Sequence, residues 1–319
     1  MGREVLVIQN RDIYGLNISP LECVKWVDES FRLKALAQLP PKMSVHPQGN
    51  DFFTSMPCCL PSSYGVFGMK VVHRILGATP SLGSEILLYD SKSGQLQALI
   101  DGDWITTMRT GAVAALIQHL QRTNTDTYSF MGLGNTARAT ALCLLSIFSD
   151  KKLKFRLLRY KTQAESFIER FKEVNNVSFE IVDTIDHLVS GADVLISCIT
   201  DAQNLICENN ELYRKGLLLV PIHTRGFQNC DLFFDKVYGD DTGHVSGFRY
   251  FDRFKEFDEF GNILIGKNRG RENDEQRIVV YNIGLGLHDV VFAYKIHCLL
   301  KNTVSTSFIL DKEDEKFWI

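Results

Sequence analysis

The chain has 319 residues, of which 45% are hydrophobic and 23% are charged, as in a globular protein with a sizeable core. Its formal net charge of −3 gives no reason to expect a nucleic acid or an anionic membrane surface as partner. No apolar run is long enough to span a bilayer, and the first residues, MGREVLVIQNRD, carry charges where a signal peptide needs an apolar segment. We therefore expect neither a nucleic acid nor a membrane as partner.

The cysteines and histidines lack the spacings of metal sites. There are eight of each, without a C-x-x-C pair, an H-x-H pair or an H-E-x-x-H motif. The cysteines are scattered through apolar runs, which is typical of reduced, mostly buried thiols. We expect a cytoplasmic protein with no metal site.

The first part of the chain reads as an α+β region. A helix is expected to begin at Ser19-Pro20, because Ser is a capping residue and Pro suits the first helical position. A second, longer helix is expected from Ile105 to Gln121, where apolar residues recur at helical spacing. Residues 1–124 should form the first part of an α+β domain. Strands are expected at Val5 to Ile8, Asp51 to Met56, Val66 to His73, Glu85 to Asp90 and Gln95 to Ile100.

A dinucleotide fingerprint follows at the start of the next region. The apolar strand Tyr128 to Met131 leads into Gly132-Leu-Gly134-Asn135-Thr136-Ala137, and a helix-forming run continues to Phe148. In this G-x-G-x-x-A pattern, Gly132 permits the tight turn, Gly134 lets a pyrophosphate approach the backbone, and Ala137 lets the helix pack on the strand. The N–H groups of the first helical turn, at Asn135 and Thr136, should face the diphosphate. The motif predicts an NAD(P) site.

Strands and helices alternate beyond the fingerprint, which predicts a doubly wound parallel sheet over residues 125–271. An acidic, aromatic surface helix is expected from Phe248 to Phe260. The final helix, Gly286 to Leu300, should return to the first domain, so that residues 272–319 complete it, with a polar tail from Asp311 to Ile319. The fold class is thus α/β, with a Rossmann-type domain inserted between two parts of an α+β domain. The expected strands are Phe155 to Leu158, Val177 to Val182, Ala192 to Thr200, Gly216 to Ile222, Lys236 to Asp240 and Arg277 to Asn282.

Four further residues bear on the cofactor. NAD enzymes usually place an acid after the second Rossmann strand, but this chain has Arg159 and Lys161 there. Cations can pair with a 2′-phosphate, so NADP(H) is favoured over NAD(H), although a charged turn without a cofactor role would look the same. Thr200, at the end of a buried strand, should border the nicotinamide. Asp289 opens the last helix, where the helix dipole favours an acid.

Several motifs, in order, resemble the ornithine cyclodeaminase/mu-crystallin family. They are Gly68-Met-Lys70, the segment Ala98 to Gly102, Ile105-Thr-Thr-Met-Arg109-Thr-Gly111-Ala112, and Gly284-Leu-Gly286-Leu-His-Asp289. The glycine turn follows Arg109 at the distance that this family uses. The resemblance covers nearly the whole chain. It implies a two-domain homodimer, an NAD(P) site, and chemistry at the α-carbon of an amino or imino acid. It also implies that residues 1–124 form the first part of a substrate-binding and dimerisation domain.

The resemblance also implies roles for individual residues. Lys70 matches the family's catalytic lysine, and burial in an apolar strand would lower its pKa; a lysine snorkelling from a strand edge is the alternative. Arg109 matches the carboxylate-binding arginine, which could otherwise be a helix-surface residue. Lys42 stands where the family has a second such arginine, or is a surface-loop lysine. Asp289 is implied to lie near the nicotinamide carboxamide.

One position departs from the family. Where cyclodeaminases have a catalytic aspartate, this chain has Arg225, in a loop that also contains His223. The nearest acid, Asp231, falls on a more peripheral family position. Arg225 or His223 could meet an anionic group of the substrate, or the loop could simply be solvated.

The expected function is therefore an NAD(P)-dependent oxidoreductase that transfers hydride at the α-carbon of a small amino or imino/keto acid. One alternative is redox-neutral cyclodeamination of ornithine to proline plus ammonia. The other is a non-catalytic protein of mu-crystallin type that binds NADPH and a small ligand. The presence of both Lys70 and Arg109 favours chemistry over binding alone.

Overall fold

The computed structural model describes residues 2–200 and 202–311. They divide into two compact units. The first unit contains residues 2–19, 29–109 and 285–311, and the second contains Pro20–Asp28 and Thr110–Gly284. This confirms the α/β class, with a Rossmann-type unit inserted in a second domain.

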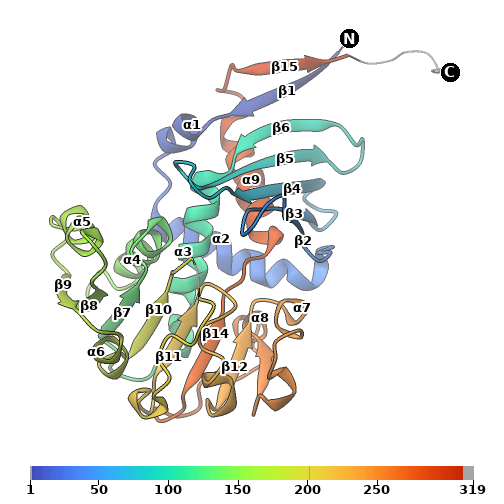
Figure 1. The fold of residues 1–319 in the computed structure, drawn as a ribbon. Coiled ribbons are helices and arrows are strands. Elements are labelled where there is room, and N and C mark those ends of the chain that lie inside the picture. The colour runs from blue at the N-terminus through green and yellow to red at the C-terminus, as the bar shows by residue number, and fades with distance from the viewer. Residues whose placement is uncertain (1, 201, 312–319) are drawn as a thin grey trace. The chain divides into compact units, whose positions relative to one another are not determined.

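The first unit is built on a mixed sheet (Figure 1). Within the described residues it has seven strands in the order β15-β1-β6-β5-β4-β3-β2. β1 pairs with β6 in parallel, and all other neighbours are antiparallel. The strands are β1 (Arg3–Ile8), β2 (Met43–Val45), β3 (Phe52–Cys59), β4 (Val66–Arg74), β5 (Leu82–Asp90), β6 (Leu96–Asp101) and β15 (Ser307–Leu310).

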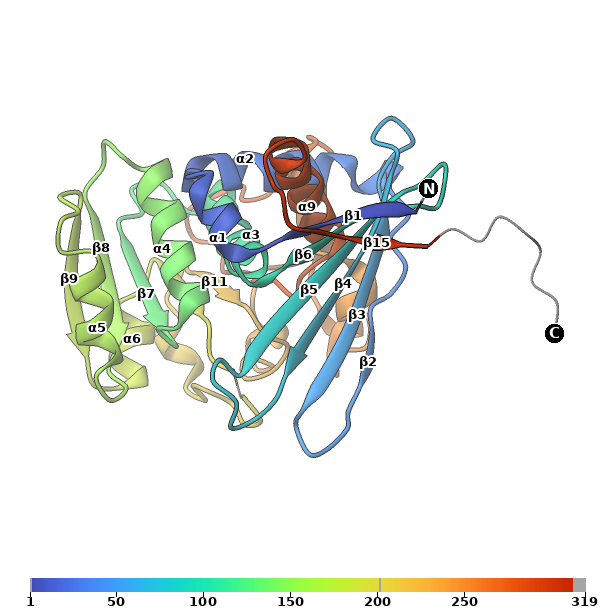
Figure 2. The same cartoon turned by 90° about the horizontal axis from the view of Figure 1, so that it is seen from above.

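One face of this sheet is covered by α9 (Gly286–Leu300), which contacts β3, β4 and β5 (Figure 2). Two glycines allow the helix to come close. A Cβ at Gly68 would lie 2.7 Å from a methyl group of Val290, and one at Gly286 would lie 2.9 Å from the carbonyl oxygen of Met56. Such distances are too short for a side chain, so the first turn of α9 sits directly against β3 and β4. Other helices with residues in this unit are α1 (Asn10–Gly15), α2 (Pro20–Leu33), η1 (Lys34–Leu36) and the start of α3 (Asp103–Leu116).

The second unit contains a sheet whose neighbouring strands are all parallel. Its order, among the described residues, is β13-β12-β14-β11-β10-β7-β8-β9. The chain adds strands to one side of the fingerprint strand β7 first and then to its other side. Such folds bind ligands at this topological switch point, beyond the carboxyl ends of the strands. The strands are β7 (Thr127–Met131), β8 (Leu153–Leu158), β9 (Val177–Val182), β10 (Val194–Ser197), β11 (Leu218–Pro221), β12 (Lys236–Gly239), β13 (Phe257–Glu259) and β14 (Ile278–Tyr281).

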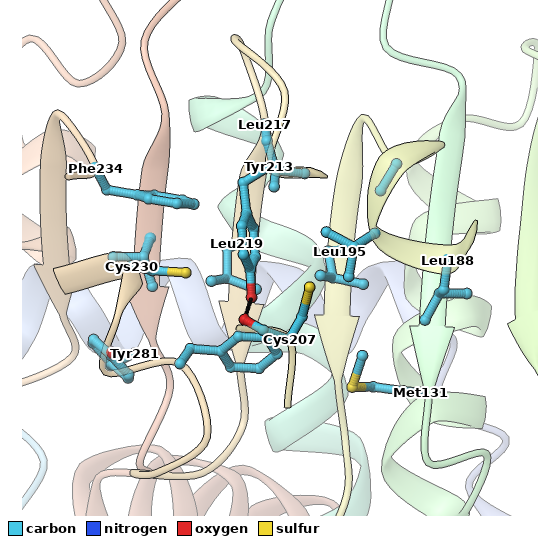
Figure 3. Close-up of a cluster of buried hydrophobic side chains, with 14 of the residues drawn as sticks. Met131, Leu188, Leu195, Cys207, Tyr213, Leu217, Leu219, Cys230, Phe234 and Tyr281 are labelled. Atoms are coloured by element: carbon cyan, nitrogen blue, oxygen red, sulfur yellow. Dashed lines mark hydrogen bonds between the residues drawn. The ribbon is translucent and has the colours of Figure 1, made fainter. Parts of the chain in front are cut away.

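A large apolar cluster fills the second unit around β10, β11 and β14 (Figure 3). Tyr213 lies at its centre, and its hydroxyl donates a hydrogen bond of 3.0 Å to the carbonyl oxygen of Cys207. This bond satisfies the one polar atom of a fully buried ring. The helices of this unit, besides the later part of α3, are η2 (Ile117–Leu120), α4 (Asn135–Ile147), α5 (Gln163–Arg170), α6 (Ile185–Ser190), η3 (Asn210–Leu212), η4 (Cys230–Leu232), α7 (Thr242–Val245), η5 (Phe251–Arg253) and α8 (Phe260–Leu264).

Some elements differ from the sequence expectation. The helix expected from Phe248 to Phe260 is wrong: the segment forms η5 and β13, and α8 begins at its last residue. Phe251, Phe254 and Phe257 pack on one another with ring centroids 5.1–6.0 Å apart, so their spacing of three reflects a local aromatic cluster. β14 pairs with β11 and β12, so this unit continues beyond residue 271 to Gly284. The expected tail lies outside the described residues except for Asp311.

No helix in the described part of the chain has both the length and the apolar character needed to cross a bilayer.

Candidate active site

The first unit holds a fully buried lysine in its sheet. Lys70 lies on β4, opposite Met56 of β3 and Ile86 of β5, and its side chain is 0% exposed. It therefore does not snorkel from a strand edge. A buried ammonium group needs a counter-charge and hydrogen bonds, because water cannot solvate it.

That counter-charge comes from Asp289, in the first turn of α9. Its Oδ1 accepts from Lys70 Nζ at 2.8 Å and from Arg109 Nε at 2.9 Å. The exposed fraction is 0% for Asp289 and 5% for Arg109. Segments of β4, α3 and α9 thus bring three charged groups, far apart in sequence, to one buried point.

The charges of these three groups do not cancel. Counting Lys70 and Arg109 as +1 each and Asp289 as −1 gives +1. Burial and the charge of Arg109 lower the pKa of Lys70 to about 7, although Asp289 opposes this shift. Burial would raise the pKa of Asp289, but the charges of Arg109 and Lys70 outweigh it and hold that pKa below its usual range. The cluster has a permanent Arg–Asp pair and an amine that can gain or lose a proton near neutral pH.

A chain of hydroxyl groups extends from the lysine. Lys70 Nζ donates to Thr106 Oγ1 at 3.4 Å, which lies 2.8 Å from Ser84 Oγ. The backbone N–H of Ser84 donates to Asp103, one turn earlier on α3. The sequence reading missed Thr106, although it lies three residues before Arg109 and so on the same helix face.

Lys42 lies near this cluster as well. It precedes β2, its side chain is half-buried, and its charge contributes to lowering the pKa of Lys70. The structure therefore brings together Lys42, Lys70, Arg109 and Asp289 within the first unit. The sequence reading had not linked Asp289 to Lys70, because nothing in a sequence shows which carboxylate meets a buried amine.

The second unit contains the fingerprint turn between β7 and α4. Gly132 has φ +76°, and a Cβ there would lie 2.7 Å from the carbonyl group of Cys198, so glycine is required. A Cβ at Gly134 would meet nothing within 4 Å, so the space before α4 is open. Asn135 and Thr136 begin this helix, and Ala137 is buried. The helix has 13 residues, and its open N-terminus lies beside a glycine turn. This arrangement fits the diphosphate of a dinucleotide.

Arg159 and Lys161 follow β8, the neighbour of the fingerprint strand. Arg159 forms ion pairs of 2.6 Å with Asp183 and with Glu165. Lys161 has φ +50°, and its Nζ lies 5.4 Å from the centroid of the Tyr160 ring. Both cations are exposed to solvent, at the position where Rossmann folds in general recognise the ribose of a bound dinucleotide.

Thr200 and Arg225 lie on loops that follow β10 and β11, and both are exposed. His223 joins these loops: its Nε2 lies 2.6 Å from Ser197 Oγ, and its Nδ1 lies 2.6 Å from the carbonyl oxygen of Arg225. Burial lowers the pKa of His223, which favours a neutral ring. The ring thus fixes the backbone of Arg225 at the carboxyl edge of the second sheet.

Asp231, the nearest acid to Arg225 in sequence, is fully buried. Its Oδ1 accepts from the hydroxyl of Tyr281 at 2.7 Å, and its buried Oδ2 has no partner among the described residues. Burial raises the pKa of Asp231 to about 7 from 3.8. This carboxyl group belongs to the core of the second unit.

The raised pKa predicts a pH-dependent stability. The pKa of Asp231 is about 7 in the folded protein and near 3.8 in the unfolded chain. The free energy of unfolding should therefore fall as pH rises between these two values, and it should level off above pH 7. Asp231→Asn, which mimics the protonated form, should gain roughly 2–4 kcal/mol relative to the parent between pH 4 and pH 8. Urea unfolding of both proteins at each pH measures the difference. A difference that does not change with pH would contradict the shift.

Comparisons with known proteins show the family. Residues 3–303 match the model of the "Ornithine cyclodeaminase/mu-crystallin family". An alanine dehydrogenase of Archaeoglobus fulgidus is 25% identical over 325 residues, covering 95% of this chain and 98% of that protein. The chain belongs to the ornithine cyclodeaminase/mu-crystallin family.

Two solved structures share the fold. One is a Δ1-pyrroline-2-carboxylate reductase of Thermococcus litoralis in complex with NADH and L-proline, with a TM-score of 0.81, 22% identity and coverage of 95% of this chain and 99% of that one. The other is an archaeal alanine dehydrogenase dimer with bound NAD, with a TM-score of 0.80, 23% identity and coverage of 96% and 99%. These likenesses confirm the expected fold.

Proposed function

We propose that this protein is an NAD(P)-dependent oxidoreductase that transfers hydride at the α-carbon of a small amino or imino acid. The observation that carries the proposal is the buried cluster of Lys70, Asp289 and Arg109. The family relatives named above are an alanine dehydrogenase and a pyrroline-carboxylate reductase. A glycine turn and an open helix N-terminus supply a place for the dinucleotide.

Arg109 binds the substrate carboxylate in this proposal. A guanidinium has five N–H donors, and the bond from Nε to Asp289 leaves an edge that suits a carboxylate. The cluster charge of +1 with Lys70 protonated favours an anion, and the charge of Lys42 adds to it. Asp289 fixes the guanidinium orientation, so the carboxylate is held at a defined distance from Lys70.

Lys70 moves the proton. Reduction of an imine adds hydride to carbon and a proton to nitrogen, and oxidation of an amine removes both. When bound, the nicotinamide supplies or accepts the hydride. Lys70, with a pKa of about 7, can donate or accept the proton near neutral pH. Thr106, in contact with Nζ, can orient the amine.

The two alternatives are less well supported. A cyclodeaminase of the usual kind needs an aspartate where this chain has the exposed Arg225. We propose instead that Arg225 meets an anionic group of the substrate, while Thr200 borders the nicotinamide. A pure binding protein would have no need for a buried lysine with a depressed pKa, which costs stability.

A turnover assay tests the proposal. Keto acids with ammonia, preformed cyclic imines and free amino acids are incubated with each cofactor, and products are identified by mass spectrometry. We expect net oxidation of the reduced cofactor with an imino acid. Conversion of ornithine to proline without net cofactor change would support the cyclodeaminase. Tight cofactor binding without any product would support the binding protein.

We further propose that NADP(H) is favoured over NAD(H), because Arg159 and Lys161 follow β8 where NAD enzymes place an acid. A cytoplasmic location is also proposed, because all eight cysteines are unpaired, as in proteins of reducing compartments.

A homodimer through the first sheet completes the proposal. The face of this sheet opposite α9 carries apolar side chains that are only half-buried, among them Phe67, Met69, Val71, Leu87 and Tyr89. A contiguous apolar sheet face of this kind is typical of subunit contacts. The archaeal alanine dehydrogenase above is a dimer. Light scattering at micromolar concentration tests this, and a monomer would rule it out.

A further inference from the structure

The adenosine end of the dinucleotide site carries two acids as well as two cations. Arg159 directly follows β8, and its backbone N–H donates to the carbonyl oxygen of Val182, the last residue of β9. Asp183 directly follows β9, so it lies beside Arg159 on the neighbouring strand end. Glu165 reaches the same arginine from the first turn of α5.

The two acids hold the guanidinium from two sides. Arg159 Nε lies 2.6 Å from Asp183 Oδ1, and the terminal nitrogen Nη1 lies 2.6 Å from Glu165 Oε1. The exposed fractions are 46% for Arg159, 73% for Asp183 and 50% for Glu165. These are exposed ion pairs, which contribute little to stability and can rearrange when a ligand arrives.

The local charge is therefore balanced. Arg159 and Lys161 give +2, and Asp183 and Glu165 give −2, so their sum is 0. A 2′-phosphate would have to compete with two carboxylates for Arg159, and it would itself be repelled by them. A 2′-hydroxyl could instead donate to Asp183, because a carboxylate is the group that usually recognises it.

We propose that Asp183 and Glu165 set the cofactor preference by restraining Arg159. They reduce the preference for NADP(H) that the two cations would otherwise give, and Asp183 takes the part of the acid that is missing after β8. The inference rests on the dinucleotide site of the proposed function, but not on the substrate.

Calorimetric titration with NADPH and with NADH tests this without any substrate. In Asp183→Asn/Glu165→Gln, the ratio of NADPH to NADH affinity should rise roughly 5- to 20-fold, as expected when two like charges leave a partly exposed phosphate site. The rise should shrink in high salt. In Arg159→Ala/Lys161→Ala, NADPH should weaken far more than NADH.

The matched control is Glu169→Gln, which removes an exposed carboxylate of the same helix, paired with Lys172 and not with Arg159. Its affinity ratio should equal that of the parent. Because NADPH and NADH share the diphosphate, an effect of a substitution on diphosphate binding cancels in the ratio of their affinities. Thermal unfolding checks that each variant is folded. An unchanged ratio in the Asp183/Glu165 variant would overturn this inference alone. Failure of the parent to bind either dinucleotide would overturn the proposed function as well.

Discussion

Replacing Lys70 by methionine should lower turnover by ~10²–10⁴-fold, the usual contribution of a positioned acid–base group. Methionine keeps the length and fills the apolar space between Met56 and Ile86, but it cannot carry a proton. Asp289 keeps its bond to Arg109, so the variant should fold and bind the substrate carboxylate. Single-turnover hydride transfer, followed at the nicotinamide absorbance, separates binding from chemistry.

The pH dependence of kcat/KM tests the role of Lys70 independently. With a free-enzyme pKa of about 7, the protonated fraction of Lys70 falls as pH rises through that value. In the direction of imine reduction, kcat/KM of the parent should therefore fall above about pH 7, and this limb should vanish in Lys70→Met. Arg109→Lys is the contrasting variant: it retains charge but loses the two-pronged geometry, so it should weaken mainly substrate binding. A Lys70→Met protein with parental turnover would show that this lysine is structural.

Much of the fold follows from local patterns in the sequence. The fingerprint turn was predictable because only glycine fits at Gly132, where φ is +76° and the backbone of Cys198 lies within 2.7 Å of a Cβ. The final helix was predictable because its apolar run is long. The segment from Phe248 to Phe260 was not, since aromatic residues three apart can pack as a compact loop cluster as well as on a helix.

Some features of the candidate site could likewise be predicted from the sequence, and others could not. Lys70 and Arg109 could be proposed from motifs, because each lies in a short distinctive run. Their shared partner Asp289 lies 180 residues beyond Arg109, and only the packing of α9 on β4 brings it there. The acids that hold Arg159 come from the residue after β9 and from α5, so the residues after β8 show the cations but not their partners.

A second large effect is expected at Asp289 itself. Asp289→Asn removes the anion between Lys70 and Arg109 while nearly preserving shape. Breaking a buried ion pair by removing one partner typically costs about 3–5 kcal/mol, because the remaining charge is left buried without compensation. Lys70 can reduce that cost by releasing its proton, since loss of the carboxylate removes the interaction that raises its pKa. Arg109 cannot reduce the cost by losing a proton, because a guanidinium group keeps its charge in proteins.

The double variant Lys70→Met/Asp289→Asn tests this explanation. If Lys70 and Asp289 stabilise each other as an ion pair, both single substitutions remove that same interaction, so the two substitutions should cost less together than the sum of their separate costs. Urea midpoints of the parent, both single variants and the double variant give the coupling energy. Glu169→Gln, which breaks an exposed pair of 2.6 Å, is the control and should change stability by less than about 1 kcal/mol. An Asp289→Asn protein as stable as the parent, or purely additive effects, would show that Asp289 is not the counter-charge on which the buried cluster depends.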